Sequence, residues 1–275
     1  MHPSTPNAEL RFLGTGWSHG VPMLACDCPV CTGGHPRNRR RRPSVQVLSG
    51  GLTTVIDTGP DFKDQALTFG ITRLDAVFIT HEHADHVMGL DDVRRFTWKR
   101  AEPLPIYADA ATLERLRIVY PYVTEVRVPG KAVPKIRFTL WDGPIEVAGV
   151  RYSRLDVPHA ENMSCCGVLL ESGGMKTAYL PDCNDLPGAV MDRIRGAEVI
   201  ILNALRHNPH PAHLTLERSL ELLTDLKPTR GYLTHMGCDF DYPALNPQLP
   251  PGIEMAYDGL RIGVSSSLRQ SGQPL

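Results

Sequence analysis

The sequence shows no excess of charge of either sign and no long apolar run. Lysine and arginine together number 29, against 30 aspartates and glutamates, so no overall field draws the protein toward nucleic acid or an anionic membrane. No stretch approaches the roughly 18 apolar residues that a membrane helix needs, and residues 1–7 lack the basic and then apolar character of a signal segment. We therefore expect a soluble, cytoplasmic protein whose contacts with anions are local.

Internal repeats and long linkers are also lacking. No pattern recurs at a period of about 20 to 50 residues. A hydrophobic content of 42% in 275 residues is ample for a buried core. These features predict a single domain over residues 1–275, with an irregular loop insertion at about 20–44.

Cysteine is scarce, and its count of seven is odd, which argues against a disulfide framework. Three of the seven lie close together, at a spacing that suits a metal ion better than disulfides: Cys26, Cys28 and Cys31. Cys165 and Cys166 are adjacent, so a bond between them would be strained, and in a strand their side chains would face opposite ways. We interpret these two and Cys183 as packing residues.

Strand-like and helix-like segments alternate along the chain, which indicates a mixed α/β fold. Short apolar runs between turn residues predict buried strands at Leu10–Leu13, Thr53–Ile56, Ala76–Ile79, Leu104–Tyr107 and Val199–Leu202. After Thr215, leucines at intervals of three or four residues predict one apolar helix face, formed by Leu216, Leu220, Leu223 and Leu226. From Ile136 to Tyr179, strand-like pieces broken by glycine turns predict an antiparallel meander and hence a second sheet.

Three histidines and an aspartate follow the buried run 76–80 directly. Ligands in α/β proteins gather at the carboxyl ends of strands. His81 and His83 are two residues apart, so both can point into one cavity, whereas Asp85 and His86 come after a turn and can serve a second ion. The run His81–His86 therefore predicts a site for two metal ions.

This run resembles the His-x-His-x-Asp-His signature of the metallo-β-lactamase superfamily, and Asp57-Thr58-Gly59 resembles the Asp-x-Gly element of the same fold. The resemblance spans roughly residues 9–264. It implies an αββα sandwich, in which two mixed sheets pack face to face with helices outside. It also implies three later ligands, each after an apolar or strand-like run: His159, Asp182 and His235.

By this similarity the ligands form two sets that Asp182 bridges. One ion would be held by His81, His83 and His159, and the other by Asp85, His86 and His235. Two divalent ions about 3.5–4 Å apart lower the pKa of a shared water, whose hydroxide then attacks, and they stabilise the charge that develops. Ligands of this mix accept several metals, and we expect two zinc or manganese ions as cofactors.

The loop 203–215 supplies a candidate acid for the leaving group. In the phosphodiesterase branch of the superfamily a histidine in this position protonates the departing alkoxide, and an imidazole with a pKa near 6.5 suits that task. We expect His213, just before the predicted helix, to be the general acid, with His207 as second candidate and Asp85 counted with them as a catalytic residue. A solvated loop is the alternative for His207 and His210.

The cysteine cluster narrows the resemblance. The N-terminal pattern resembles that of the phosphoribosyl cyclic phosphate phosphodiesterases of bacterial phosphonate degradation. It consists of Gly14-Thr15-Gly16, Gly20-Val21-Pro22 and the three clustered cysteines. In that group the three cysteines share a structural zinc with a histidine three residues after the last active-site histidine, where this chain has Cys238. Thiolate and imidazole both suit tetrahedral zinc. The resemblance therefore implies one structural zinc on Cys26, Cys28, Cys31 and Cys238.

The arginine run Arg39–Arg42 leaves two interpretations open. Guanidinium groups match phosphate oxygens, so the run could contact a substrate phosphate or a nucleic acid. A solvated loop requires no ligand and is our expectation.

Taken together, the residues predict a dinuclear metal-dependent hydrolase of a small phosphodiester, cyclic or nucleotide-like, with no nucleic-acid or membrane partner. Whether the chain forms a homodimer stays open. The same arrangement of metal ligands can support attack on many kinds of electrophile, so a thioester or lactone hydrolase is an alternative. A nuclease resembling the transfer-RNA 3′-end endonucleases is disfavoured by the near-neutral charge. A non-hydrolytic protein like the pyrroloquinoline-quinone synthesis protein B group is disfavoured by the full set of ligands.

Overall fold

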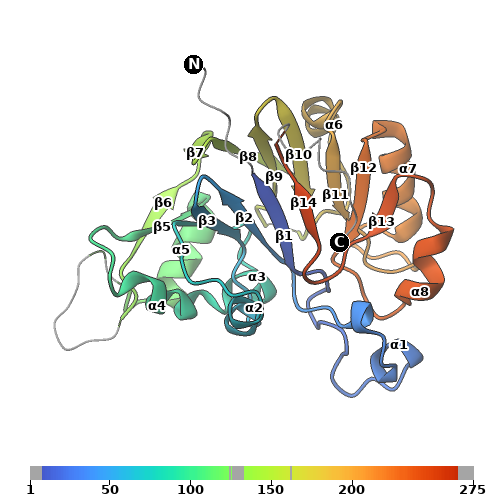
Figure 1. The fold of residues 1–275 in the computed structure, drawn as a ribbon, viewed down its shortest axis with the longest axis horizontal. Helices are drawn as coiled ribbons and strands as arrows, with labels where there is room; N and C mark the ends of the chain where they lie inside the picture. Colours follow the sequence, from blue (N-terminus) through green and yellow to red (C-terminus); the bar gives the residue numbers. More distant parts are fainter. Residues whose placement is uncertain (1–7, 124, 126–132, 162, 266–275) are drawn as a thin grey trace.

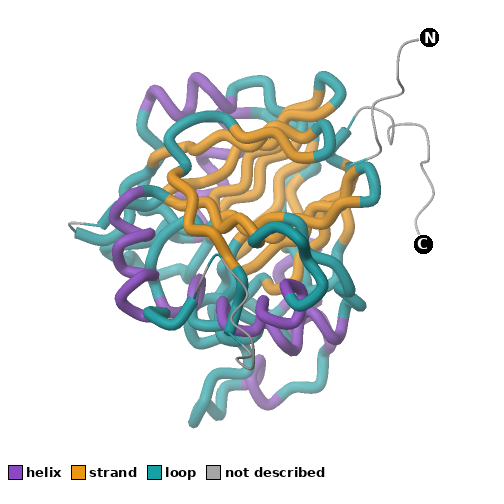
Figure 2. The backbone as a smooth tube through the Cα atoms, turned by 90° about the vertical axis from the view of Figure 1, so that its left-hand side faces the viewer, coloured by secondary structure: helices purple, strands orange, loops and turns teal. Residues whose placement is uncertain are grey.

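Two seven-stranded β-sheets pack face to face, with helices on their outer sides (Figure 1). The protein is described from a computed structural model that covers residues 8–123, 125, 133–161 and 163–265. Figure 2 shows the strands gathered in the middle of the molecule and the helices around them. The architecture is the predicted αββα sandwich.

The first sheet has the strand order β14-β1-β2-β3-β4-β5-β6. Its pairs are antiparallel from β14 to β3 and parallel from β3 to β6. The strands are β1 (Glu9–Gly14), β2 (Ser44–Ser49), β3 (Leu52–Ile56), β4 (Ala76–Phe78), β5 (Leu104–Ala108), β6 (Ile136–Leu140) and β14 (Arg261–Gly263). The helical segments of this half are α2 (Phe62–Thr68), α3 (Ala84–Val87), η2 (Leu90–Val93), α4 (Arg94–Thr97) and α5 (Ala110–Val119).

The second sheet has the order β13-β12-β11-β10-β9-β8-β7, antiparallel from β7 to β10 and parallel from β10 to β13. The strands are β7 (Ile145–Val147), β8 (Val150–Asp156), β9 (Cys166–Ser172), β10 (Met175–Leu180), β11 (Val199–Asn203), β12 (Arg230–Thr234) and β13 (Ile253–Met255). The helical segments of this half are α6 (Gly188–Ile194), α7 (Leu216–Leu226), α8 (Tyr242–Leu245) and η3 (Asn246–Gln248). Two short helical segments, α1 (Pro29–Thr32) and η1 (Pro36–Asn38), lie in the predicted loop insertion.

Apolar side chains from both sheets fill the space between them. Phe78 of β4 stacks on Tyr152 of β8 with ring centroids 4.3 Å apart, and both are fully buried. On the outer faces, separate clusters join the first sheet to α2 and α5 and the second sheet to α6 and α7. Cys165 belongs to the outer cluster of the second sheet and Cys166 to the cluster between the sheets, which confirms that these adjacent cysteines pack on opposite faces.

Helix α7 begins where the sequence predicts. The hydroxyl of Thr215 accepts a hydrogen bond from the backbone N–H of Arg218 and caps the helix. The buried face consists of Leu216, Ser219, Leu222, Leu223 and Leu226. Leu220, which we placed on that face, is only partly buried and lies at its edge.

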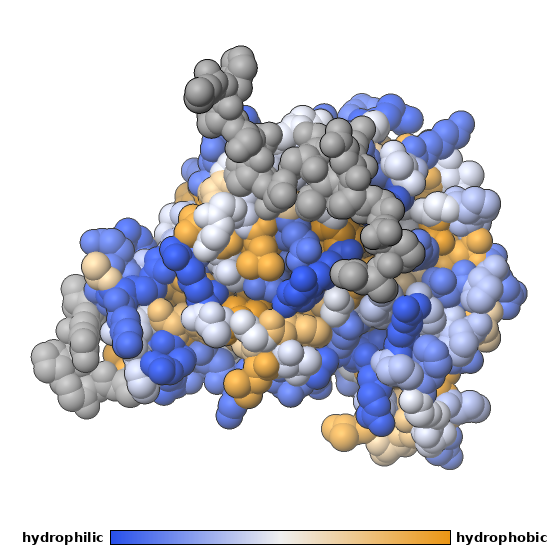
Figure 3. Space-filling view, in the orientation of Figure 1, coloured by the Kyte–Doolittle hydropathy of each residue, from blue (hydrophilic) through white to orange (hydrophobic). Residues whose placement is uncertain are grey.

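The surface of the molecule mixes side chains of both kinds. Figure 3 shows hydrophilic residues interspersed with hydrophobic ones over the face that it presents. No helix in the described part of the chain has both the length and the apolar character needed to cross a bilayer.

The meander predicted from Ile136 to Tyr179 begins later than expected. Strand β6 (Ile136–Leu140) pairs in parallel with β5 and belongs to the first sheet. The antiparallel meander of the second sheet starts at Ile145. Periodicity alone could not separate the two sheets, because Ile136 and Phe138 alternate as they would in either one.

The expectation of a solvated loop at Arg39–Arg42 is wrong for most of the run. Arg39 is exposed, but Arg40 is only 1% exposed. Arg41 pairs with Asp64 and Asp258, and Arg42 pairs with Asp61 at 2.9 Å. Four like charges in a row suggest solvent exposure, but partners far away in the sequence bury or neutralise three of them.

Candidate metal centre

The histidine run lies at the carboxyl end of β4, as predicted. His83 is the cap residue before α3, in extended conformation, so Asp85 and His86 fall in the first turn of that helix. The backbone N–H of His86 donates to the carbonyl of His83. The expected turn inside the run is therefore the start of a helix, and it separates the two pairs of ligands.

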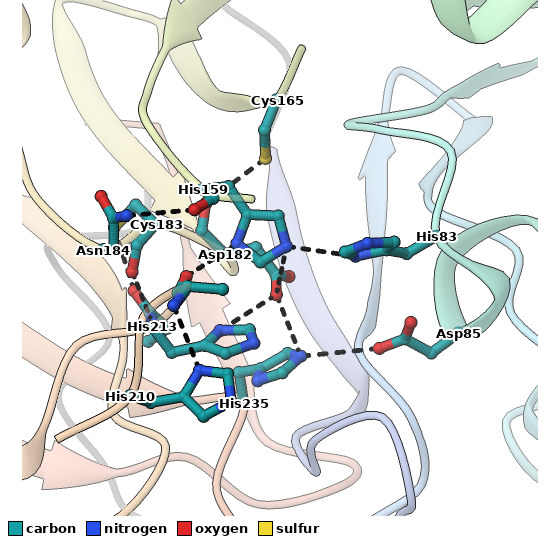
Figure 4. Close-up of polar contacts among 12 residues, drawn as sticks. His83, Asp85, His159, Cys165, Asp182, Cys183, Asn184, His210, His213 and His235 are labelled. Atoms are coloured by element: carbon teal, nitrogen blue, oxygen red, sulfur yellow. Dashed lines mark hydrogen bonds and ion pairs between the residues drawn. The ribbon is translucent and has the colours of Figure 1, made fainter. Parts of the chain in front are cut away.

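The first predicted set of ligands converges in space. His81 Nε2 lies 3.0 Å from His83 Nδ1, and His159 Nε2 lies 3.1 Å from the same Nδ1 atom. One ring nitrogen of each histidine falls within a group that spans at most 4.8 Å. His159 follows β8, so two separate sheets supply this set. Figure 4 shows His83 and His159 facing each other across the site.

The second predicted set also converges. His86 Nε2 is 3.4 Å and His235 Nε2 is 3.6 Å from Asp85 Oδ2. His235 follows the last residue of β12, in a left-handed backbone conformation with φ of 55°. A non-glycine residue in this region costs about 1–3 kcal/mol, and such residues cluster at functional sites.

Asp182 lies between the two sets, after the end of β10 (Figure 4). One carboxylate oxygen is 3.0 Å from His86 Nε2, and the other is 3.1 Å from His235 Nε2 and 4.0 Å from His159 Nε2. The carboxylate is 1% exposed. Its two oxygens can thus reach ions held by either set.

The unsatisfied atoms of this cluster fit metal ions. His86 Nε2, both ring nitrogens of His235 and Asp182 Oδ2 are buried and form no hydrogen bond of acceptable geometry among the described residues, although Asp182 lies about 3 Å from Nε2 of both histidines. A buried polar atom without a partner costs free energy, and here several face one another around a common centre. Nitrogen and carboxylate oxygen are the ligands that zinc and manganese accept.

Charges in the cluster act on one another strongly. Burial alone would lower the pKa of His86, but the carboxylates of Asp182, Asp57 and Asp85 outweigh burial and raise it well above its usual value. Burial would raise the pKa of Asp182, but His235 and His86 hold it well below its usual value. The imidazoles and carboxylates therefore stabilise one another's charged forms, and because metal ligands have to be deprotonated, a metal ion bound here would compete with protons.

Asp57 supports the ligands from behind. Its Oδ2 lies 2.7 Å from His86 Nδ1 and accepts a hydrogen bond from the Thr80 hydroxyl, while Oδ1 accepts one from the Thr80 N–H. A carboxylate in this position fixes the tautomer of a ligating histidine and leaves Nε2 free for the metal. We assigned Asp57 only to the Asp-x-Gly element. Its position immediately after an apolar strand was the available signal for a role in the site.

The glycine of the same element has a steric role. A Cβ atom on Gly59 would lie 1.8 Å from the carbonyl oxygen of Asp85, and one on Gly89 would lie 2.0 Å from the carbonyl oxygen of Gly59. The backbone that carries Asp85 therefore packs directly on Gly59, and only glycine allows this approach.

His213 lies against the metal ligands. Its ring stacks on His235 at 4.7 Å and lies 4.8 Å from His159, with Nδ1 3.4 Å from Asp182 Oδ1. Its side chain is 9% exposed. Burial and the charge of His235 lower the pKa of His213 to about 2. His159, Asp182 and His213 are also close enough to form a group that could hold an ion.

The other two histidines of the loop differ in position. His210 has its ring 5.0 Å from that of His213 and accepts a hydrogen bond from the Ala212 N–H. His207 is 52% exposed, pairs with Glu217 at 2.8 Å and belongs to none of the groups of potential ligands found among the described residues. The geometry thus brings His213, and not His207, to the predicted ligands.

The four cysteines of the second predicted site also meet. Cys26, Cys28, Cys31 and Cys238 place their sulfurs within 4.8 Å of one another, and none of them forms a disulfide. The Cys31 N–H donates to Cys28 Sγ, and the Met23 N–H donates to Cys31 Sγ. Four thiols at this spacing, with backbone N–H donors to two of the sulfurs, fit tetrahedral zinc.

Comparison with known proteins agrees with this geometry. The profile of the β-lactamase superfamily domain matches residues 53–236. A solved structure described as a new diphosphatase from the PhnP family is 39% identical, covers 93% of this chain and 97% of its own, and superposes with a TM-score of 0.85. The chain belongs to the β-lactamase superfamily and, within it, to the PhnP family. It is accordingly a hydrolase by family.

This PhnP-family chain is also similar to two proteins with other names. The octanoyltransferase of Porphyromonas gingivalis is 33% identical over 256 residues, which are 90% of this chain and 50% of that protein. The chain thus spans about half the length of this relative. Zinc-bound PqqB from Methylobacterium extorquens is 20% identical with a TM-score of 0.75, over 92% of this chain and 99% of its own, and shares the fold.

Proposed function

We propose that the chain hydrolyses a small phosphodiester at the two ligand sets that Asp182 bridges. The observation that carries the proposal is the position of His213, with its ring against His159 and His235 and Nδ1 3.4 Å from Asp182. An alkoxide leaving group needs a proton, and a general acid has to lie within reach of the bond that breaks.

The seven ligands are assigned as their distances suggest. His81, His83 and His159 would hold one ion, Asp85, His86 and His235 would hold the other, and Asp182 would serve both. Two bound zinc or manganese ions would activate a water and neutralise the negative charge of the phosphate. Asp57 fixes the ring of His86, and the helix start at His83 separates the two sets.

The charge of the substrate decides whether His213 can act as the acid. Burial and His235 disfavour the imidazolium form, and metal cations would act in the same direction. A phosphodiester carries a negative charge, which favours a protonated neighbour. A neutral thioester or lactone offers no such help, so this histidine suits an anionic substrate. His207, the second candidate, is exposed and serves as the residue for comparison.

We also assign a structural zinc to Cys26, Cys28, Cys31 and Cys238. The convergence of the four sulfurs supports it. Zinc there would tie the loop insertion to the segment that follows His235 and so fix one wall of the centre.

The PhnP-family structure supports the phosphodiesterase assignment, because it is described as a diphosphatase, an enzyme that also cleaves a bond to phosphorus. Acyl chemistry is the second candidate. It is favoured by the match to half of a protein named octanoyltransferase, since acyl transfer and thioester hydrolysis both attack a carbonyl carbon.

The experiment that separates the two is a substrate panel with purified, metal-loaded protein. Bis(p-nitrophenyl) phosphate, a 2′,3′-cyclic nucleotide, octanoyl-coenzyme A and a lactone are compared by kcat/KM, with Asp182→Asn as the inactive control. We expect turnover of the phosphodiesters alone. Turnover of octanoyl-coenzyme A without turnover of either phosphodiester would overturn the proposal in favour of the second candidate.

The setting of the reaction follows from the same features. We propose a cytoplasmic enzyme that acts on a small molecule and not on nucleic acid. None of the seven cysteines forms a disulfide, which suits a reducing compartment, and the balanced net charge gives no overall attraction for a polynucleotide.

A further inference from the structure

Arg40 is one of the largest fully buried side chains of the protein, at 1% exposure. Its Nη1 donates to the carbonyl of Gly237 at 3.0 Å, and its Nη2 donates to the carbonyl of Phe240 at 2.7 Å and to Asn38 Oδ1 at 3.2 Å. All three partners are neutral oxygens. The remaining donor, Nε, is buried and has no partner among the described atoms.

No carboxylate forms an ion pair with this guanidinium anywhere in the described part of the chain, and the two acids that act on it at longer range have hydrogen-bond partners of their own. Asp241 accepts a hydrogen bond from Asn38 at 2.6 Å, and Asp258 binds Thr15 and Arg41. A buried charge without a counter-charge is strongly destabilising. Negative charge that does not touch the guanidinium must therefore offset the burial of Arg40.

The four-cysteine site supplies part of that negative charge. The two carbonyls that Arg40 binds, those of Gly237 and Phe240, flank Cys238 in the sequence. Burial lowers the pKa of Arg40 to about 10, and the negative charges that oppose burial are those of Asp258, Asp241, Cys238 and Cys31. Zinc with four thiolates carries roughly two excess negative charges, which a nearby guanidinium would partly neutralise.

The backbone of Arg40 reaches the other limb of the same site. Arg40 and Val21 exchange two backbone hydrogen bonds of 2.8 Å each, five residues before Cys26. The side chain meanwhile holds the segment around Cys238. One residue thus fixes both chain segments that must meet to form the site, and it also supplies a positive charge.

We propose that Arg40 is the counter-cation and clamp of the four-cysteine zinc site. It is a positioning residue, and it acts on zinc retention rather than on the reaction. The inference rests on the structural zinc assigned above and is independent of the substrate, so it stands or falls separately from the phosphodiesterase proposal.

The test measures how fast the zinc-loaded protein loses this zinc to a chelating dye, 4-(2-pyridylazo)resorcinol. Alkylation of each cysteine by iodoacetamide, read by peptide mass spectrometry, identifies the site that is losing metal. Buried Cys165, Cys166 and Cys183 are internal standards for unfolding. Arg40→Met removes the charge, Arg40→Lys keeps it, and Arg39→Met is the matched control on an exposed neighbour.

We expect Arg40→Met to lose zinc from the four cysteines about tenfold or more faster, as is typical when a supporting residue of a metal site is removed. Arg40→Lys should lie between Arg40→Met and the unaltered protein, and Arg39→Met should not differ from the latter. In a Cys238→His background the site carries one negative charge fewer, so Arg40→Met should there have a clearly smaller effect. If Arg40→Met does not fold, Arg40→Gln takes its place against Arg40→Lys.

Three results would overturn the proposal. If Arg40→Met loses zinc no faster than the unaltered protein, Arg40 is neither the counter-cation nor the clamp of the site. If Arg40→Met speeds zinc loss equally with and without the Cys238→His substitution, Arg40 does not act through its charge. If the unaltered protein is alkylated equally with and without added zinc, the four cysteines bind no structural zinc and Arg40 has no role in retaining it. This result would not bear on phosphodiester turnover, which is judged separately.

Discussion

Asp57 Oδ2 lies 2.7 Å from Nδ1 of His86, and both side chains are fully buried. The contact leaves Nε2 of His86 directed at the carboxylates of Asp85 and Asp182. The orientation of this metal ligand therefore depends on a residue that does not reach the metal itself.

Replacing this carboxylate should weaken the metal centre. In Asp57→Asn the amide cannot accept from the Thr80 hydroxyl, the Thr80 N–H and His86 at once, so the ring of His86 loses its fixed tautomer. We expect active-site metal affinity to fall about 10- to 100-fold, measured by competition with a chelator. Asp64→Asn, at a 67% exposed side chain, is the matched control. Unchanged affinity in Asp57→Asn would refute the supporting role.

Gly59 should not tolerate a methyl group. An added Cβ would overlap the Asp85 carbonyl at 1.8 Å, so Gly59→Ala must push α3 outward or fail to fold. We expect a loss of at least about 1–3 kcal/mol in unfolding free energy, measured by chemical denaturation, together with lower metal content. Gly143→Ala, where nothing lies within 4 Å, should change stability by under about 0.5 kcal/mol. Similar values for the two variants would contradict the packing described here.

Asp258 should give stability a distinctive pH dependence. Its side chain is 7% exposed, and burial outweighs its hydrogen bonds from the Arg41 and Thr15 backbone N–H groups and raises its pKa to about 6. The folded state thus holds this proton more tightly than the unfolded chain. The resulting stabilisation is complete below the unfolded pKa near 4 and is lost as the pH rises through about 6.

The measurement is the difference in unfolding free energy between the unaltered protein and Asp258→Asn at pH 4 and pH 7. The variant has no proton to lose at this position. The advantage of the unaltered protein should therefore shrink by up to about 3 kcal/mol from pH 4 to pH 7. A difference that grows with pH would show that the ion pair with Arg41 outweighs burial.

The general acid can be tested through the leaving group. His213→Ala should reduce kcat by about 10²- to 10⁴-fold on a diester with an alkyl leaving group and far less on a p-nitrophenyl ester, which leaves without a proton. The number of bound metal ions should not change. Loss of one ion in this variant would instead make His213 a ligand with His159 and Asp182. His207→Ala, at an exposed histidine, should leave both substrates unaffected.

Much of the fold could be predicted because local signals agreed with it. The apolar runs that we expected to form strands lie in β1, β3, β4, β5 and β11. The later ligands were expected from the resemblance to the superfamily, and the strand ends agree with that expectation, since His81, Asp182 and His235 each follow a strand. Sheet membership of β6 was misjudged, since a strand's own sequence does not specify its partner.

What the sequence could not reveal depends on residues that are distant along the chain. Arg40 is buried because carbonyls some 200 positions away satisfy it, and no local pattern encodes those partners. Asp57 supports His86 across 29 positions. His213 and His207 could not be ranked by geometry before the fold was known, because both lie in the same proline-broken loop.

The central claim is that two metal ions in the ligand sets bridged by Asp182 drive phosphodiester hydrolysis. The most direct test titrates zinc or manganese into metal-free protein while bis(p-nitrophenyl) phosphate turnover and bound metal are measured together. We predict that activity rises to a plateau when two ions per chain are bound in addition to the zinc of the four cysteines. Full activity with a single ion outside the cysteine site, or no phosphodiester turnover at full metal loading, would contradict the account.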